Sequence, residues 1–191
     1  AASMMVAIYH MLRYGMEYQD LGADHFDRRD RATLAGRLIR RLEELGLQVN
    51  DHVPELGCTL GQELLKPTRI YVAPALQALA QFKIRGLVHI TGGGFFDNIP
   101  RVLQSGCKAV IDKGSWEVPK IFSFLQKKGK VAEAEMFRTF NMGIGMMLVV
   151  DSADAEPLME QFRATGETPF LLGEMQVAGE GEAQVQINGL A

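Results

Sequence analysis

Apolar and polar positions alternate along the chain in a way that predicts strands interleaved with helices beyond residue 50. Apolar-rich runs of strand length cover residues 86–90, 107–112, 144–150, 170–177 and 183–187. Apolar residues recur at helical spacing over residues 60–65, 74–83, 118–126, 132–140 and 154–164. Such runs and spacings are typical of strands and helices respectively. We therefore expect an α+β fold, with a mixed sheet of about five strands and helices packed on it.

Three details of this prediction rest on local sequence. The continuous apolar run of residues 144–150 predicts a central strand that is covered on both faces. The Ala-Gly-Glu-Gly-Glu segment at residues 178–182 predicts a hairpin that joins the last two strands. A short helical segment is expected after Pro100, because proline is favoured in the first turn of a helix.

The first 49 residues predict a separate, helical, arginine-rich lead. Ser3 can cap a helix that ends near Tyr14, and Asp24 can cap a second helix with one leucine stripe. All eight lysines lie beyond residue 50, whereas the lead uses only arginine. We therefore divide the chain into residues 1–49 and 50–191. The seven arginines of the lead are offset by seven acidic residues, which favours a solvated helix face over a nucleic-acid contact.

Composition narrows the classes of partner. A net charge of −3 and 47% hydrophobic residues argue against nucleic-acid binding, which usually shows a basic excess. No apolar run approaches the ~20 residues that span a bilayer, and the first residues lack a basic n-region. We expect a cytoplasmic protein without a membrane or nucleic-acid partner. The widely separated Cys58 and Cys107 predict no disulfide framework and no zinc site. Asp24, His25 and Asp27 are too close in sequence to share one helix face, so we expect no metal ligands.

The glycine run after the first predicted strand is the strongest candidate for chemistry. Residues 86–90 end in Thr91-Gly92-Gly93-Gly94, and Asn98 and Arg101 follow within reach. A glycine turn that exposes backbone N–H groups before a helix can hold phosphate, and His89 can act as an acid or base near neutral pH. The alternatives are an ordinary tight turn without a ligand and a histidine that is satisfied in the core.

A second polar patch precedes the strand at residues 144–150. Arg138 can pair with an anionic ligand through two hydrogen bonds, and Asn141 can hydrogen-bond a substrate amide or hydroxyl. The alternative is a helix-to-strand connection in which Gly143 and Gly145 only permit close packing.

Three runs of the sequence carry a resemblance to a known family. They are Leu64–Val72 (LLKPTRIYV), His89–Leu103 (HITGGGFFDNIPRVL) and Met136–Met146 (MFRTFNMGIGM). In this order they resemble the C-terminal domain of phosphoribosylformylglycinamidine cyclo-ligase, also called AIR synthetase, over about residues 48–188. The resemblance implies an ATP-dependent ring closure in purine biosynthesis, in which formylglycinamidine ribonucleotide becomes aminoimidazole ribonucleotide.

The resemblance also implies roles for individual residues and partners. His89 would belong to the catalytic centre, with ATP and Mg²⁺ as cofactors. The residues that would contact substrate or phosphate are Thr91, Gly92, Gly93, Gly94, Asn98, Arg101, Arg138 and Asn141. The partners would be the phosphorylated ribonucleotide and ATP, together with a second copy in a homodimer or a separate N-terminal half-domain.

The sequence departs from that family at its beginning. The preceding domain with the main ATP-binding elements is not found in the sequence, so we expect incomplete activity without it. Residues 5–48 instead resemble the C-terminal tail of insertion-sequence transposases, through Tyr18–Asp27 and Arg37–Gly46. Two alternatives therefore stay open: a non-catalytic phosphate-binding or interaction module, and a fusion remnant of a mobile element.

Overall fold

The computed structural model describes residues 43, 46 and 48–190, and all elements below belong to the unit Asn50–Ala191. The two helices predicted for the lead, and the transposase-like segment apart from a few residues, lie outside the described residues. The elements in chain order are β1 (His52–Val53), β2 (Cys58–Thr59), α3 (Leu60–Leu64), α4 (Val72–Gln81), β3 (Gly86–His89), α5 (Gly94–Asn98), the 3-10 helix η1 (Ile99–Val102), β4 (Cys107–Asp112), the 3-10 helix η2 (Lys113–Ser115), α6 (Lys120–Gly129), α7 (Glu133–Thr139), β5 (Met146–Val149), α8 (Ser152–Ala164), β6 (Gly173–Val177) and β7 (Val185–Asn188).

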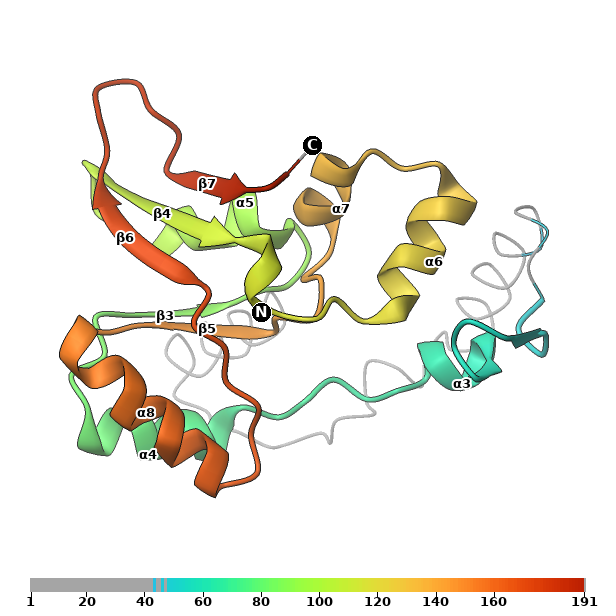
Figure 1. The fold of residues 1–191 in the computed structure, drawn as a ribbon, viewed down its shortest axis with the longest axis horizontal. Coiled ribbons are helices and arrows are strands. Elements are labelled where there is room, and N and C mark those ends of the chain that lie inside the picture. The colour runs from blue at the N-terminus through green and yellow to red at the C-terminus, as the bar shows by residue number, and fades with distance from the viewer. Residues whose placement is uncertain (1–42, 44–45, 47, 191) are drawn as a thin grey trace, which may run out of the picture. The chain divides into compact units, whose positions relative to one another are not determined.

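The α+β class and the mixed strand pairing are confirmed, but the predicted strands form two sheets instead of one (Figure 1). β3 and β5 make an antiparallel pair, and β4 lies between β6 and β7 in a second sheet. Residues from both sheets, in β4, β5 and β6, line a cleft. The described residues also contain the short antiparallel pair β1–β2, which the sequence did not predict.

The predicted hairpin of the last two strands is wrong. β6 runs antiparallel to β4 and β7 runs parallel to it, so β4 separates the two strands (Figure 1). Val185 and Ile187 of β7 are buried and pair with Ala109 and Ile111. Burying these side chains on the core face stabilises the parallel pairing, at about 25 cal/mol per Å² of apolar surface, and a local hairpin would not provide that contact.

One further prediction needs correction. β5 pairs only with β3 among the described residues, and its four residues are half-buried, so it is not a doubly covered central strand.

The short helical segment expected after Pro100 is present as η1, which has Pro100 at its start. The helix α5, which was not predicted, precedes it from Gly94. The N-cap of α5 is Gly93, with a left-handed φ of 94°, and its Phe95 is buried in the core, so burial and a glycine cap favour this additional helix.

Three aromatic rings join α5, α7 and the segment after η2 in the core. Phe95 stacks on Trp116 with ring centroids 5.9 Å apart and packs on Phe137 at 5.4 Å. All three side chains are buried. Trp116 is therefore a core residue. Aromatic pairs of this kind add to the stabilisation from burial, so this cluster fixes the ends of the segments that form the site.

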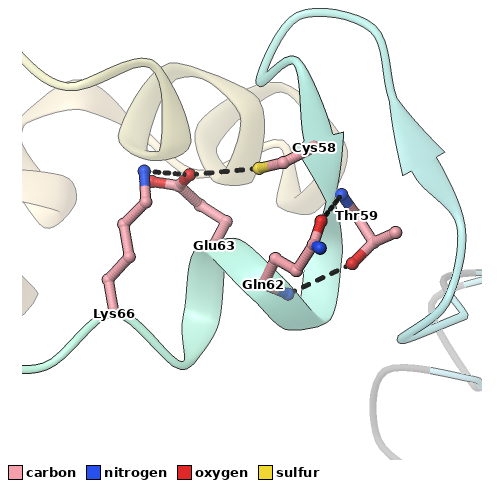
Figure 2. Close-up of polar contacts among 5 residues, drawn as sticks. All are labelled: Cys58, Thr59, Gln62, Glu63 and Lys66. Atoms are coloured by element: carbon pink, nitrogen blue, oxygen red, sulfur yellow. Dashed lines mark hydrogen bonds and ion pairs between the residues drawn. The ribbon is translucent and has the colours of Figure 1, made fainter.

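The region before α4 is held locally by its own polar contacts. Thr59 and Gln62 form a capping box at the start of α3, with reciprocal side-chain and backbone hydrogen bonds of 3.2 and 3.0 Å (Figure 2). Glu63 accepts from Lys66 Nζ at 2.6 Å and from Cys58 Sγ at 3.4 Å (Figure 2). Burial, followed by the Glu63 carboxylate, raises the pKa of the Cys58 thiol. The thiol is therefore held in its protonated form, which is a poor nucleophile.

Candidate functional site

Two glycine-containing segments meet at one end of the β3–β5 pair. His89 at the end of β3 lies opposite Met146 at the start of β5. One residue further, the Ile90 N–H donates to the Gly145 carbonyl at 2.9 Å. Because the strands are antiparallel, the turn Thr91–Gly94 leaves the pair at the same end at which Asn141–Gly145 enters it. The structure thus brings the two predicted patches together.

Tyr71, the N-cap residue of α4, joins the same end of the strand pair. Its ring lies edge-on to His89, with centroids 6.1 Å apart. A Cβ on Gly145 would collide with the Tyr71 hydroxyl, so this close approach requires glycine. Burial raises the pKa of Tyr71, which keeps the phenol neutral. The sequence analysis did not select Tyr71, although it lies in the first of the three runs that carry the resemblance.

Asn98 fixes the shape of the glycine turn from inside. The side chain is buried, and its Nδ2 donates to the carbonyls of Thr91, Gly92 and Gly94 at 3.3, 3.2 and 2.8 Å. The Thr91 hydroxyl donates to Asn98 Oδ1 at 3.5 Å. The amide group is therefore occupied within the protein. The structure places Asn98 behind the turn, where it positions the backbone, and we now expect no direct ligand contact from it.

The outer side of the turn carries unpaired backbone donors. Within residues 48–190, the N–H groups of Thr91, Gly92 and Gly93 donate to no other residue, whereas the Gly94 N–H closes the turn onto the Thr91 carbonyl at 3.0 Å. A Cβ added to Gly92 would meet no atom within 4 Å. Consecutive free N–H groups of this kind form a concave anion-binding surface. The turn therefore leaves backbone N–H groups available, and phosphate binding there stays a prediction.

The segments next to this turn carry charged side chains of both signs. His89, Arg101 and Arg138 are exposed. The Arg138 guanidinium lies 5.2 Å above the Phe96 ring of α5, and its Nε is 3.6 Å from Glu135. Among the described residues no hydrogen bond or ion pair holds Arg101. The Asp97 side chain packs against Gly93 and places one negative charge at the turn.

Asn141 shapes the second segment. Its Oδ1 accepts from the Gly143 N–H at 3.0 Å, and the Ile144 N–H donates to its backbone carbonyl at 2.8 Å. Met142 inside this turn has a left-handed φ of 49°, which is strained for a residue with a Cβ. The Trp116 Nε1–H donates to the Met142 carbonyl at 2.9 Å and holds the turn in this conformation. Sequence reasoning did not find this role for Trp116.

Replacing Trp116 with phenylalanine is expected to lower the free energy of unfolding by about 2 kcal/mol, because the buried Met142 carbonyl loses the indole N–H as its donor. The ring contacts to Phe95 would be largely kept. Urea unfolding followed by far-UV circular dichroism measures the loss without relying on tryptophan fluorescence. A loss below about 0.5 kcal/mol would show that water or a neighbouring group replaces the indole donor.

The described residues offer no ready site for a divalent cation. Within residues 43, 46 and 48–190 no group of three or more His, Cys, Asp or Glu side chains is arranged to hold a metal ion. Asp97 is the carboxylate that packs against the glycine turn. These residues therefore do not fit an Mg²⁺ site of their own. In the same part of the chain, no helix has the length and apolar character to cross a membrane.

A cleft adjoins the candidate site. It has a volume of about 1240 Å³, and its walls come from β4, β5, β6, α8 and the segment that contains Arg69 and Tyr71. Arg69 and Glu167, which both line the cleft, form an ion pair with an N–O distance of 2.5 Å. None of the nine predicted site residues lines this cleft, but Tyr71 and Gly145 do, and both lie beside the glycine turn at the strand end. The glycine turn and the cleft therefore share these two residues.

Comparison with known proteins assigns the chain to a family. Proteins named phosphoribosylformylglycinamidine cyclo-ligase are similar to it: one from Desulfotalea psychrophila is 51% identical over 141 residues, covering 73% of this chain and 40% of the relative. One from Citrifermentans bemidjiense is 50% identical over 155 residues, which cover 81% of this chain and 44% of the relative. The chain thus spans about 40–44% of the length of these relatives. Residues 40–186 match the family described as AIR synthase related protein, C-terminal domain, and the chain belongs to this family.

Proposed function

We propose that this chain supplies the C-terminal domain of an ATP-dependent phosphoribosylformylglycinamidine cyclo-ligase. The observation that carries the proposal is the meeting of all three family-like runs at one end of the β3–β5 pair, through Tyr71, His89 and Gly145. Relatives named for this activity are 48–51% identical to the chain. Because the chain covers less than half of each relative, the complete reaction would need the remaining domain, joined to this chain or supplied by a partner.

In the proposed reaction, ATP phosphorylates the amide oxygen of the substrate, and an internal amine then closes the imidazole ring with loss of phosphate. Catalysis of such a step depends mainly on positioning and on neutralising phosphate charge. The free N–H groups of Thr91, Gly92 and Gly93 would hold a phosphate group of substrate or nucleotide. Arg101 and Arg138 would balance its charge, and His89 would exchange a proton with the reacting atoms.

Asn98 and Asn141 have different roles in the proposed reaction. Asn98 would position the glycine turn through the three carbonyls to which it donates. Asn141 uses its Oδ1 inside its own turn, while its Nδ2 donates to no residue of the part described here and would be available to substrate. Mg²⁺ would be held mainly by the nucleotide and by the domain that precedes this one in the relatives, because the described residues provide no ligand group.

Replacing Gly92 with valine is expected to weaken phosphate-ligand binding at least ~10-fold while leaving the fold unchanged, because the added Cβ meets no atom within 4 Å and the side chain would block the free N–H groups. Calorimetry with ATP–Mg²⁺ and with formylglycinamidine ribonucleotide, in the presence and absence of a family N-terminal domain, measures the affinity. Thermal unfolding reports the fold.

The matched control is Ser105→Val, which adds bulk in another exposed turn. Unchanged affinity in the Gly92 variant would remove the glycine turn from the site. No binding heat from the wild-type protein in either mixture would favour the module or remnant alternatives over the ligase function.

A further inference from the structure

Helix α4 turns its large apolar side chains toward solvent. Val72, Leu76 and Leu79 are 63%, 61% and 52% exposed, whereas Ala78 is completely buried. Their spacing of four and three residues places them on one helix face. The sequence predicted an amphipathic helix here, and surface helices normally bury their large apolar residues and expose polar ones. In α4 the small alanine faces inward and the large residues face outward.

The apolar face extends to the residue just before the cap of the helix. Ile70, next to Tyr71, is 80% exposed. We call Ile70, Val72, Leu76 and Leu79 the α4 surface. α4 carries no charged residue, since its sequence is VAPALQALAQ. A contiguous apolar surface without charges is unusual on a monomeric protein and marks a contact with another protein surface. A lipid surface would instead favour lysine or arginine on the helix.

The position and size of the α4 surface indicate what covers it. The relatives extend well beyond this chain, and the matched family is a C-terminal domain, so in the relatives another domain precedes this one. The α4 surface lies within the first part of the matched region, 40–186, near the point where that preceding domain would join. Four side chains supply only part of the about 800 Å² per partner that a stable complex of separate molecules needs, so the docking face would extend beyond these four residues.

We propose that the α4 surface is the docking site for the domain that precedes this one in the cyclo-ligase relatives. The inference rests on the proposed function for the identity of the partner, since it takes that partner from the same family. It goes further by assigning the contact to one helix face. Docking there would also hold Tyr71, which contacts His89, at the end of α4 next to the glycine turn.

The test uses the full 191-residue chain and, as probe, the segment of the Desulfotalea psychrophila relative that precedes the matched region. Only a preparation of this segment that unfolds cooperatively on heating, and is therefore folded, is used as the probe. Binding is measured by sedimentation velocity and calorimetry without nucleotide. We expect saturable binding by the wild-type chain. The double variant Leu76→Glu with Leu79→Glu should bind at least ~10-fold more weakly, because docking would bury two unpaired carboxylates.

Val177→Glu is the matched control, because Val177 is 86% exposed on β6, away from α4. It should bind as tightly as the wild type, and all variants should keep the wild-type melting temperature. Absence of binding by the wild type, or equal losses in the control and the double variant, would overturn the proposal. So would a wild-type homodimer that the double variant alone dissociates, since the surface would then bind a second copy. If docking is normal but the Gly92→Val variant binds the phosphate ligand as tightly as the wild type, only the proposed role of the glycine turn would be refuted.

Discussion

Replacing Gly94 with alanine is expected to reduce the free energy of unfolding by about 3–5 kcal/mol, because a strained left-handed backbone and a steric clash add together. Gly94 has a φ of 55°, and a Cβ there would lie only 2.0 Å from the backbone carbonyl oxygen of Phe137 in α7. The backbone of α5 and that of α7 are in direct contact at this point, so no side-chain rotation relieves the clash. Since the free energy of unfolding of a small domain is only about 5–15 kcal/mol, the variant should be partly unfolded at 37 °C.

The Gly92→Ala variant is the natural control for this experiment. Gly92 lies two residues earlier in the same turn, has no left-handed φ, and would place its Cβ in open space. Urea unfolding of both variants should therefore show a large loss for Gly94 and a change within about 0.5 kcal/mol for Gly92. Similar stabilities of the two variants would show that α5 and α7 are not packed as described.

Replacing Asn98 with aspartate is expected to cost at least about 3 kcal/mol at pH 7, because it buries a charge without a partner. The Nδ2 group that donates to three carbonyls would become an oxygen that faces the same three acceptors. Loss of these bonds would release the turn Thr91–Gly94. Ligand binding at the turn should therefore be lost together with stability, which urea unfolding and calorimetry measure on the same preparation.

The pH dependence of this variant follows from the protonation state of the new carboxyl group. Burial without a donor raises its folded-state pKa above the unfolded value of about 3.9. Between these two pKa values the folded state binds more protons than the unfolded state. The free energy of unfolding of the variant is therefore lost as the pH rises from the unfolded-state pKa of the carboxyl group to its folded-state pKa. The variant should be closest to wild type near pH 4. Asn141→Asp is the control, because Asn141 only accepts through Oδ1, a role that a carboxylate keeps.

Elements with a strong local pattern could be predicted from the sequence. β4 has the predicted bounds Cys107–Asp112, and α8 differs from its prediction by two residues at its start. The pairing of strands could not be predicted, because it depends on contacts between distant segments. β7 joins β4 across more than 70 residues, since its buried Val185 and Ile187 complete the core beside Ala109 and Ile111. A local glycine-rich connection between β6 and β7 carries no information about that choice.

The candidate site could be located from sequence, but the roles of its residues could not all be assigned. The glycine turn follows from turn chemistry, and a common site for the two patches was implied by the family resemblance. Asn98 was expected to face a ligand, and the structure shows it buried among backbone carbonyls. Tyr71 and Trp116 act on the site through packing and one backbone contact. Such roles arise from tertiary structure, and no spacing pattern in the sequence reports them. The roles of His89, Arg101 and Arg138 in ligand binding stay predictions.

The register of the β3–β5 pair has a consequence for how the sequence can change. His89 is exposed, whereas its neighbours Val88 and Ile90 are buried, so side chains alternate between the two faces. A single-residue insertion or deletion within β3 would invert this alternation. It would turn the imidazole into the interior and shift both glycine segments at once. The number of residues in β3 and β5 therefore sets the positions of both loops, which lie some 50 residues apart in the chain. A change in strand length that moves one loop also moves the other.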